Sequence, residues 1–256
     1  MARGRLWTRE ELILTLSVYK QIPFGRMNDT TPEVIELAKL IDRSPNTVAI
    51  RLGNFAACDP YIIASGRKGM PGGINTCKPI WEEFYGRTED LFMAAQLIKA
   101  EKMQVTIEQT LNLSPKDYTG RERQTVVRQR VNQSCFRTMI LNNYETHCAI
   151  TGINIPALLV ASHIIPWADR EDTRLNPDNG ICLSPLYDKA FDKGLITVNP
   201  DDYSIVLSSA LMEYQSEEYF EKQFHSIAGK RLTLPLEHSP AREFLDYHKH
   251  HVFLGT

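Results

Sequence analysis

Three polar side chains in the second half of the chain have types and spacings that could do acid–base and metal chemistry. His163 comes after Ser162 at the end of an apolar run, and a neutral imidazole, with a pKa near ~6.5, can take a proton from water. Asp188 and Asp192 are four residues apart in a segment with helical signals, so both carboxylates share a helix face and could hold a hard cation such as Mg²⁺. Two plainer interpretations stay open, namely that His163 is structural and that Asp192 caps its helix or pairs with a neighbouring lysine.

Short elements must bring these side chains together. The apolar run 157–161 predicts a buried strand that ends close to His163. After a polar loop, Asn179 and Gly180 form a turn signal that leads into a second predicted strand at 181–183. Asn179 could also be an ordinary turn residue with no role in a site. A helix over 186–192 follows, started by Ser184 and Pro185 and ended by Gly194. The predicted order is therefore strand, strand, helix.

This arrangement resembles the HNH endonucleases, the ββα-metal nuclease group, and in particular the subfamily found in many bacterial restriction-type proteins. The resemblance covers roughly residues 120–256, because an arginine-rich helix precedes the motif and a similar tail follows it. The stretches involved are ASHIIPW at 161–167, NPDNGICLS at 176–184, DKAFDKG at 188–194, GKRL at 229–232, LP at 234–235, FLDYH at 244–248 and VF at 252–253.

The resemblance implies a role for each of four residues. His163 matches the general base, and Asn179 matches the residue that pins the loop and orients that base. Asp188 takes the position of the family's last histidine, a metal ligand, and Asp192 matches a second ligand position of some members. The divalent ion, Mg²⁺ or Mn²⁺, would neutralise the scissile phosphate and stabilise the leaving 3′ oxygen, so the products would be a 5′-phosphate and a 3′-hydroxyl.

Some positions depart from the family pattern. Ser162 stands where many members have an acidic or histidine ligand, and Asp188 replaces the final histidine. Members often use two Cys-x-x-Cys pairs for zinc, but none of the five cysteines here has that spacing, so no structural zinc is expected. The departures keep open a second function, a DNA-binding regulator on a catalytically inactive nuclease fold. A third possible function is a nuclease specific for RNA or for a particular nucleic-acid structure.

The predicted fold class is α+β. An N-terminal all-helical module at 1–110 is expected to recognise DNA, and a linker connects it to a ββα-metal (HNH) nuclease domain at 120–256 with extra strands and a C-terminal helix. Gly- and Pro-rich residues 59–80 predict a long loop, and residues 89–109 predict one further helix.

Helix start signals in the N-terminal part occur at Thr8, Thr31 and Ser44. The second and third helices, joined by a tight turn, describe a helix-turn-helix, whose outer helix could read base edges in the major groove. A plain three-helix unit with a solvated polar face is the alternative. The candidate DNA-reading residues are Asn46, Thr47, Arg51 and Asn54.

A predicted helix over 121–144 begins with a cluster of arginines and a single acid, Glu122, although the net charge of the whole chain is −2. A local basic segment can bind phosphate even in a slightly acidic protein. A solvated helix face is the alternative. The candidate phosphate-binding residues are Arg121, Arg123, Arg128 and Arg130.

Length and composition exclude several classes of protein. The 256 residues contain no apolar run long enough for a transmembrane helix, and the N-terminal segment lacks the apolar core of a secretory signal. An odd number of scattered cysteines indicates reduced thiols and a cytoplasmic location. His248, His250 and His251 are expected to be packed or exposed in a terminal helix, and Trp167 is expected to pack.

The predicted function is therefore a metal-dependent DNA endonuclease of restriction or phage-defence type. Its expected partner is double-stranded DNA, with no membrane. Because one active site cuts one strand, double-strand cleavage favours a homodimer.

Overall fold

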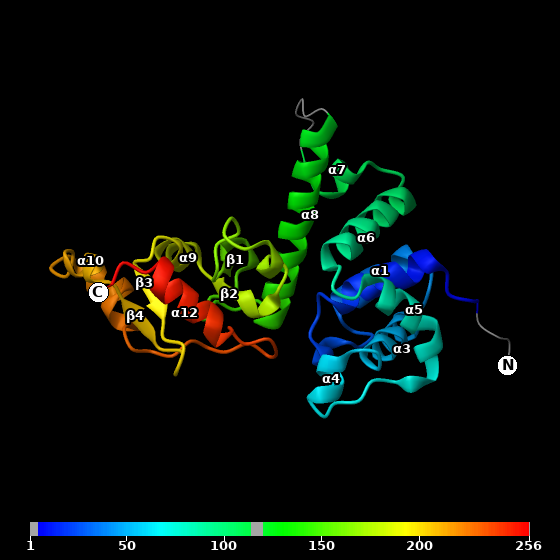
Figure 1. The fold of residues 1–256 in the computed structure, drawn as a ribbon, viewed down its shortest axis with the longest axis horizontal. Coiled ribbons are helices and arrows are strands. Elements are labelled where there is room, and N and C mark those ends of the chain that lie inside the picture. The colour runs from blue at the N-terminus through cyan, green and yellow to red at the C-terminus, as the bar shows by residue number, and fades with distance from the viewer. Residues whose placement is uncertain (1–4, 114–119, 256) are drawn as a thin grey trace. The chain divides into compact units, whose positions relative to one another are not determined.

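The structure, a computed structural model, describes residues 5–113 and 120–255 of the chain. It divides into two compact units, Met1–Cys135 and Phe136–Thr256. In the described residues, the first unit is helical and all named strands belong to the second (Figure 1). The fold class is α+β, as the sequence predicts. The boundary between the compact units lies inside a helix. The predicted division into a module at 1–110 and a nuclease domain at 120–256 stays a proposal.

Three helices form at the predicted start signals of the first unit. Helix α1 (Arg9–Tyr19) follows a complete capping box at Thr8, and α2 (Pro32–Leu40) begins after Thr31. Helix α3 (Pro45–Ala56) begins at Ser44, whose hydroxyl accepts the Thr47 N–H. Apolar faces of all three helices meet in a core that includes Leu16, Val34, Leu37, Val48, Leu52 and Phe55. Burial of these stripes against one another stabilises the bundle.

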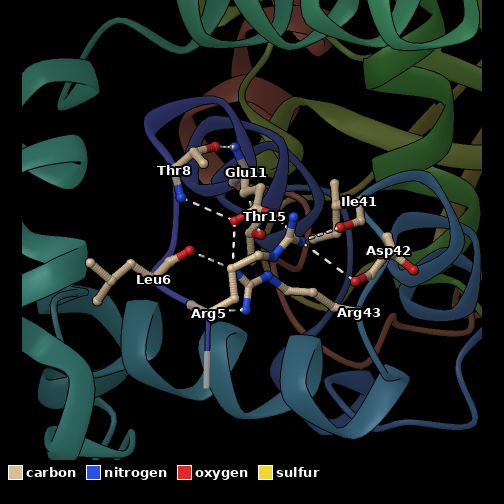
Figure 2. Close-up of polar contacts among 8 residues, drawn as sticks. All are labelled: Arg5, Leu6, Thr8, Glu11, Thr15, Ile41, Asp42 and Arg43. Carbon is tan, nitrogen blue, oxygen red and sulfur yellow. Dashed lines mark hydrogen bonds and ion pairs between the residues drawn. The ribbon is translucent and has the colours of Figure 1, made fainter. Parts of the chain in front are cut away.

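A buried carboxylate ties the N-terminal segment to the turn between α2 and α3 (Figure 2). Glu11 accepts from Arg5 at 2.6 Å and from Arg43 at 2.7 Å, and its side chain is only 3% exposed. Arg5 also donates to the carbonyl of Ile41. Although burial raises the pKa of Glu11, the Arg43 and Thr8 hydrogen bonds lower it below its ordinary value overall. The carboxylate therefore stays charged between its two arginines.

The prediction of a long loop at 59–80 is wrong. The segment contains helix α4 (Pro60–Ala64), a 3₁₀ turn η2 (Pro71–Gly73) and most of helix α5 (Ile74–Phe84). Asp59 caps α4, and α5 buries a stripe at helical spacing that consists of Cys77, Ile80, Trp81 and Phe84. Packing of that stripe outweighs the Gly and Pro content, and Pro79 is accommodated inside the helix.

The predicted single helix at 89–109 is two helices. Helix α6 (Thr88–Met103) ends where Gln104 adopts a left-handed conformation with φ 55°. Thr106 and Gln109 then form a new capping box that starts α7 (Ile107–Thr110). The predicted linker includes residues 114–119, which lie outside the described part. The long predicted helix is confirmed as α8 (Gly120–Asn143).

The second unit contains the predicted strand, strand, helix order. Strand β1 (Val160–His163) pairs antiparallel with β2 (Gly180–Leu183), and α9 (Pro185–Asp192) follows. The first strand starts later than predicted, because the turn η3 (Pro156–Leu158) occupies part of 157–161. In the register of the hairpin, His163 faces Gly180 and Ser162 faces Ile181.

Further elements surround this ββα unit. A second hairpin joins β3 (Ile196–Val198) to β4 (Ile205–Leu207), and the short helices α10 (Ser209–Met212) and α11 (Glu218–Gln223) follow. Helix α12 (Arg242–His251) lies near the C-terminus. The expected extra strands and C-terminal helix are therefore present.

His248 attaches α12 to the ββα helix. Its imidazole is 1% exposed and stacks on Phe191 with ring centroids 3.7 Å apart. Nε2 donates to the Phe191 carbonyl at 3.1 Å, and Nδ1 lies 2.9 Å from the Thr197 hydroxyl. Burial lowers the pKa of His248 to about 4. This histidine is packed, as predicted, whereas His250 and His251 are exposed.

The five cysteines are all free thiols. Among the described residues, no helix is both long and apolar enough to cross a membrane.

Candidate active site

His163 lies half-buried at the end of β1, held from three directions. Its Nε2 atom lies 3.0 Å from the Arg174 carbonyl oxygen, which can only accept, so Nε2 bears the proton and Nδ1 keeps a free lone pair. The ring stacks on Phe136 with centroids 3.7 Å apart, and the Trp167 ring meets it edge-on at 5.4 Å. The imidazole is therefore fixed in one orientation with one nitrogen available as a base.

The surroundings also keep this imidazole neutral. Burial lowers the pKa of His163, and the positive charge of Arg174 lowers it further, while the hydrogen bond to the Arg174 carbonyl opposes the shift. A neutral imidazole is the form that can accept a proton.

Asn179 is fully buried and closes the loop between the two strands. Its amide nitrogen donates to the carbonyls of Ile165 and Thr173, both at 3.3 Å, and its side-chain oxygen accepts the Ile165 N–H at 2.8 Å. These bonds fix the chain on both sides of the loop, including the residue before Arg174. The side chain has no exposed surface, so its contribution is to position its neighbours.

Gly180 makes room for the ring that supports His163. A Cβ at this position would lie 2.3 Å from Ile140 Cδ1 and 2.8 Å from Phe136 Cζ. The sequence marks Gly180 only as part of a turn, but the tertiary packing requires its lack of a side chain. Arg137, beside Phe136, donates to the carbonyls of Pro156 and Leu159 and so holds the entry to β1.

The two aspartates lie on α9, with Asp188 half-buried and Asp192 exposed. Burial raises the pKa of Asp188, and the Ser162 hydroxyl and Lys189 oppose that rise. Burial and then the negative charge of Asp188 raise the pKa of Asp192. The charge of Asp188 therefore acts on Asp192, and a bound cation would offset that repulsion.

The donors at this point suit a hard divalent cation. The buried Ser162 oxygen has no hydrogen-bond partner with acceptable geometry, although its hydroxyl is near enough to influence the pKa of Asp188. Two carboxylates and a hydroxyl are all oxygen ligands, which Mg²⁺ and Mn²⁺ prefer. Across residues 5–113 and 120–255, no group of three or more His, Cys, Asp or Glu side chains is arranged to hold a metal. An Mg²⁺ ion commonly binds one or two carboxylates and completes its shell with water and phosphate oxygens.

The buried Cys148 thiol contacts the backbone on both sides of the hairpin region. Its sulfur accepts the N–H groups of Ser184 and Thr151 at 3.2 and 3.5 Å. The thiol therefore supports the N-terminus of α9. The expectation of no structural zinc stays a prediction.

The predicted DNA-reading face of α3 is only partly open. Asn46 is exposed and Thr47 half-buried, but Asn54 is 4% exposed and donates to the Met70 carbonyl. Arg51 is half-buried, lies over the Trp7 ring and donates to the Gly73 carbonyl and the Cys77 sulfur. The expected polar outer face is therefore covered in its second half, because the segment wrongly predicted as a loop packs there.

The predicted arginine cluster lies on α8. Arg123 pairs with Glu108, and Arg128 pairs with Asp90 and Glu89. Arg130 is exposed, and the side chain of Arg121 lies outside the described residues. Exposed ion pairs contribute little to stability, so these guanidinium groups can exchange carboxylates for phosphates at small cost.

Phe136, Trp167 and Arg174 complete the surroundings of His163. Sequence reasoning did not assign them a role in the site, because their proximity depends on the loop path. The pairing of Phe136 with Arg137 before the motif, typical of the subfamily, is the one signal that could have indicated a local role.

Comparison with known proteins agrees with this geometry. Residues 148–199 match a family described as HNH endonuclease, and this range spans β1, β2 and α9. No curated protein matches the chain. The chain therefore contains an HNH endonuclease domain, with His163 on its first strand and the two aspartates on its helix.

Proposed function

We propose that this chain is a divalent-metal-dependent endonuclease that hydrolyses double-stranded DNA, as a restriction or phage-defence enzyme. The observation that supports this most is the fixed, neutral His163 with a free Nδ1, on a strand packed against the helix that bears two carboxylates. Five free thiols are consistent with the reducing cytoplasm, where such an enzyme would meet foreign DNA.

In this proposal, four residues of the chain have separate roles. Nδ1 of His163 takes a proton from water, and the water oxygen forms a bond to phosphorus while the bond from phosphorus to the 3′ oxygen breaks. Asp188 and Asp192 would hold the divalent ion, which when bound neutralises the phosphate charge and stabilises the leaving oxygen. Asn179 keeps the loop, and through it the imidazole, in place. The products are a 5′-phosphate and, once the leaving oxygen takes a proton from solvent water, a 3′-hydroxyl.

A plasmid cleavage assay with Mg²⁺ or Mn²⁺ tests the proposal. His163→Ala should lower the cleavage rate by at least about 10²-fold, since a general base contributes about that much. Asp188→Asn should lower it too, with a higher metal requirement. Equal rates for wild type and folded His163→Ala protein would contradict the proposal, and competition among duplex DNA, single strands and RNA identifies the substrate.

A second candidate, a DNA-binding regulator on an inactive nuclease fold, is favoured by Ser162. This residue supplies a hydroxyl where many relatives have a carboxylate or imidazole. Such a regulator would bind DNA with a steep salt dependence and show no metal-stimulated cutting. Detectable turnover on any nucleic acid that is lost in His163→Ala excludes it.

The N-terminal helical unit would select the site. Asn46 and Thr47 on the open first turn of α3 would contact bases or backbone, and the α8 arginines would contact phosphates. Their replacement by alanine should weaken DNA binding without altering the histidine site. A mobility-shift titration at several salt concentrations measures this effect.

A further inference from the structure

Arg174 contacts the His163 site twice, once through its backbone and once through its side chain. Its carbonyl accepts the His163 Nε2–H at 3.0 Å. Its Nε donates to the Trp167 carbonyl at 2.9 Å, and its guanidinium carbon lies 5.1 Å from the centre of the Trp167 ring. Arg174 therefore bonds back to a loop residue seven positions earlier in the chain.

Trp167 in turn meets the imidazole. The two ring planes are nearly perpendicular, at 85°, with centroids 5.4 Å apart. Phe136 is stacked on His163. The imidazole thus has an aromatic face on one side, an aromatic neighbour edge-on, and a carbonyl at Nε2, and Arg174 is connected to the last two.

The planar, five-donor guanidinium suits this task. Nε bonds to the Trp167 carbonyl while the flat group lies over the indole ring, an arrangement that a lysine ammonium does not reproduce. A terminal nitrogen also pairs with Glu171 at 3.3 Å. The side chain is only 21% exposed, and the preceding Thr173 is buried and bonded by Asn179.

We propose that Arg174 and Trp167 form a clamp, the Arg174–Trp167 clamp, that positions His163 and selects the tautomer with a free Nδ1. Arg174 is a positioning residue in this scheme, since it acts through the imidazole. The importance of Arg174 for catalysis rests on the proposed function of His163 as general base. The effect of Arg174 on the His163 tautomer does not depend on that function.

The test combines histidine NMR with kinetics on the full chain. Protein labelled with ¹⁵N-histidine gives ring spectra in which His163 is assigned by its loss in His163→Ala. In wild type, His163 should show a neutral ring with the proton on Nε2. Arg174→Ala and Trp167→Ala should produce a mixture of tautomers, and kcat should fall about 10–100-fold with little change in KM, because small misplacements of a catalytic group have effects of that size.

Three further variants separate positioning from general loss of structure. Arg174→Lys keeps the charge but lacks the Nε donor, so it should shift the tautomer even if the alanine variant fails to fold. Trp167→Phe keeps an aromatic ring and the backbone carbonyl and should retain most of the activity. Arg170→Ala is the matched control, because the side chain of this exposed loop arginine pairs only with Asp172 among the described contacts. It should change neither the His163 tautomer nor kcat.

The outcomes distinguish the clamp from the function. If folded Arg174→Ala protein keeps the wild-type tautomer and kcat, the clamp is overturned, whether or not the chain is a nuclease. The same holds if Arg170→Ala changes the spectra as strongly. If the tautomer shifts in the Arg174 and Trp167 variants but wild type cuts no nucleic acid, the clamp stands and the proposed function fails.

Discussion

At the residue scale, the chemistry of this protein depends on neighbours that remove freedom from a few side chains. The imidazole of His163 has a defined orientation because Phe136, Trp167 and the Arg174 carbonyl surround it, which suits the proposed role of base. His248 has a similar stack on Phe191, but both of its ring nitrogens are bonded and it is buried, so it has no lone pair to offer. The same residue type thus leaves one ring nitrogen available at position 163 and none at position 248.

Gly180→Ala should displace the Phe136 ring that stacks on His163. The added Cβ would press on Ile140 and Phe136, so the ring below His163 must move. We expect a loss of about 1–3 kcal/mol in the free energy of unfolding, as for other overpacked cores, and a clear fall in cleavage rate. Denaturant unfolding and the plasmid assay measure the two effects. Gly25→Ala, where nothing lies within 4 Å of the new Cβ, is the control, and equal behaviour of the two variants would refute the packing argument.

His248 should make stability depend on pH. Its folded pKa of about 4 lies below the ordinary 6.5, so the unfolded chain binds more protons between these values. Stability should therefore be highest above pH 6.5 and fall as the pH drops toward 4, by up to about 3 kcal/mol. Burial lowers the pKa of His163 as well, which adds to the slope in the same direction.

Urea unfolding between pH 7.5 and 4 measures this dependence. His248→Gln should be less stable at pH 7 but show a shallower slope, because the amide does not titrate. An unchanged slope in the variant would mean that other groups cause the acid sensitivity.

At the element scale, α3 and the segment after it illustrate how packing reassigns a surface. The helix itself forms where Ser44 and Pro45 predict it. However, Asn54 and Arg51 turn toward the 70–77 segment and bond to its backbone. A helix with polar residues on one face can therefore present that face to another part of the same protein.

The Glu11 cluster should be the strongest electrostatic contribution in the helical unit. Glu11→Gln would leave the nearly buried Arg43 without its carboxylate, so we expect a loss of about 2–3 kcal/mol, somewhat below the usual range because the amide oxygen still accepts a hydrogen bond. Glu83→Gln, which removes the exposed pair with Arg9, is the control and should cost less than about 1 kcal/mol. Thermal and urea unfolding give both values. Similar losses in the two variants would show that the burial of Glu11 does not increase its contribution to the free energy of unfolding.

At the scale of the whole molecule, each compact unit has its own core, and the HNH match lies within the second. The helical unit holds the candidate DNA-reading residues and the described α8 arginines that precede the unit boundary. This distribution supports the proposal that selection of the target and cleavage belong to different units.

Double-strand cleavage should require two copies of the chain, because one HNH site cuts one strand. Mixing wild type with excess His163→Ala should then yield nicked plasmid in place of linear product, since mixed dimers have a single working site. Sedimentation velocity with a short target duplex should show two chains per duplex. A monomer that cuts both strands in turn would instead give linear product more slowly, without lasting nicked circles.

Local sequence signals were enough to predict most of the elements and to identify the candidate chemical groups. Capping boxes, Ser-Pro starts and apolar spacing act over a few residues, so α1, α2, α3, α8, β2 and α9 could be predicted from them. The same local reasoning placed His163, Asn179, Asp188 and Asp192 in one strand, strand, helix segment, and the residues of that segment resemble the HNH endonucleases.

The surroundings of these groups depend on packing that local sequence signals do not reveal. The need for Gly at 180 and the burial of Asn54 arise from contacts between segments distant in sequence. The contacts of Arg174 with Trp167 and His163 depend on the path that the loop takes. The loop prediction at 59–80 failed for the same reason, because burial of the α5 stripe outweighed local Gly and Pro preferences. Long-range packing has no short sequence period, so spacing along the chain does not reveal it.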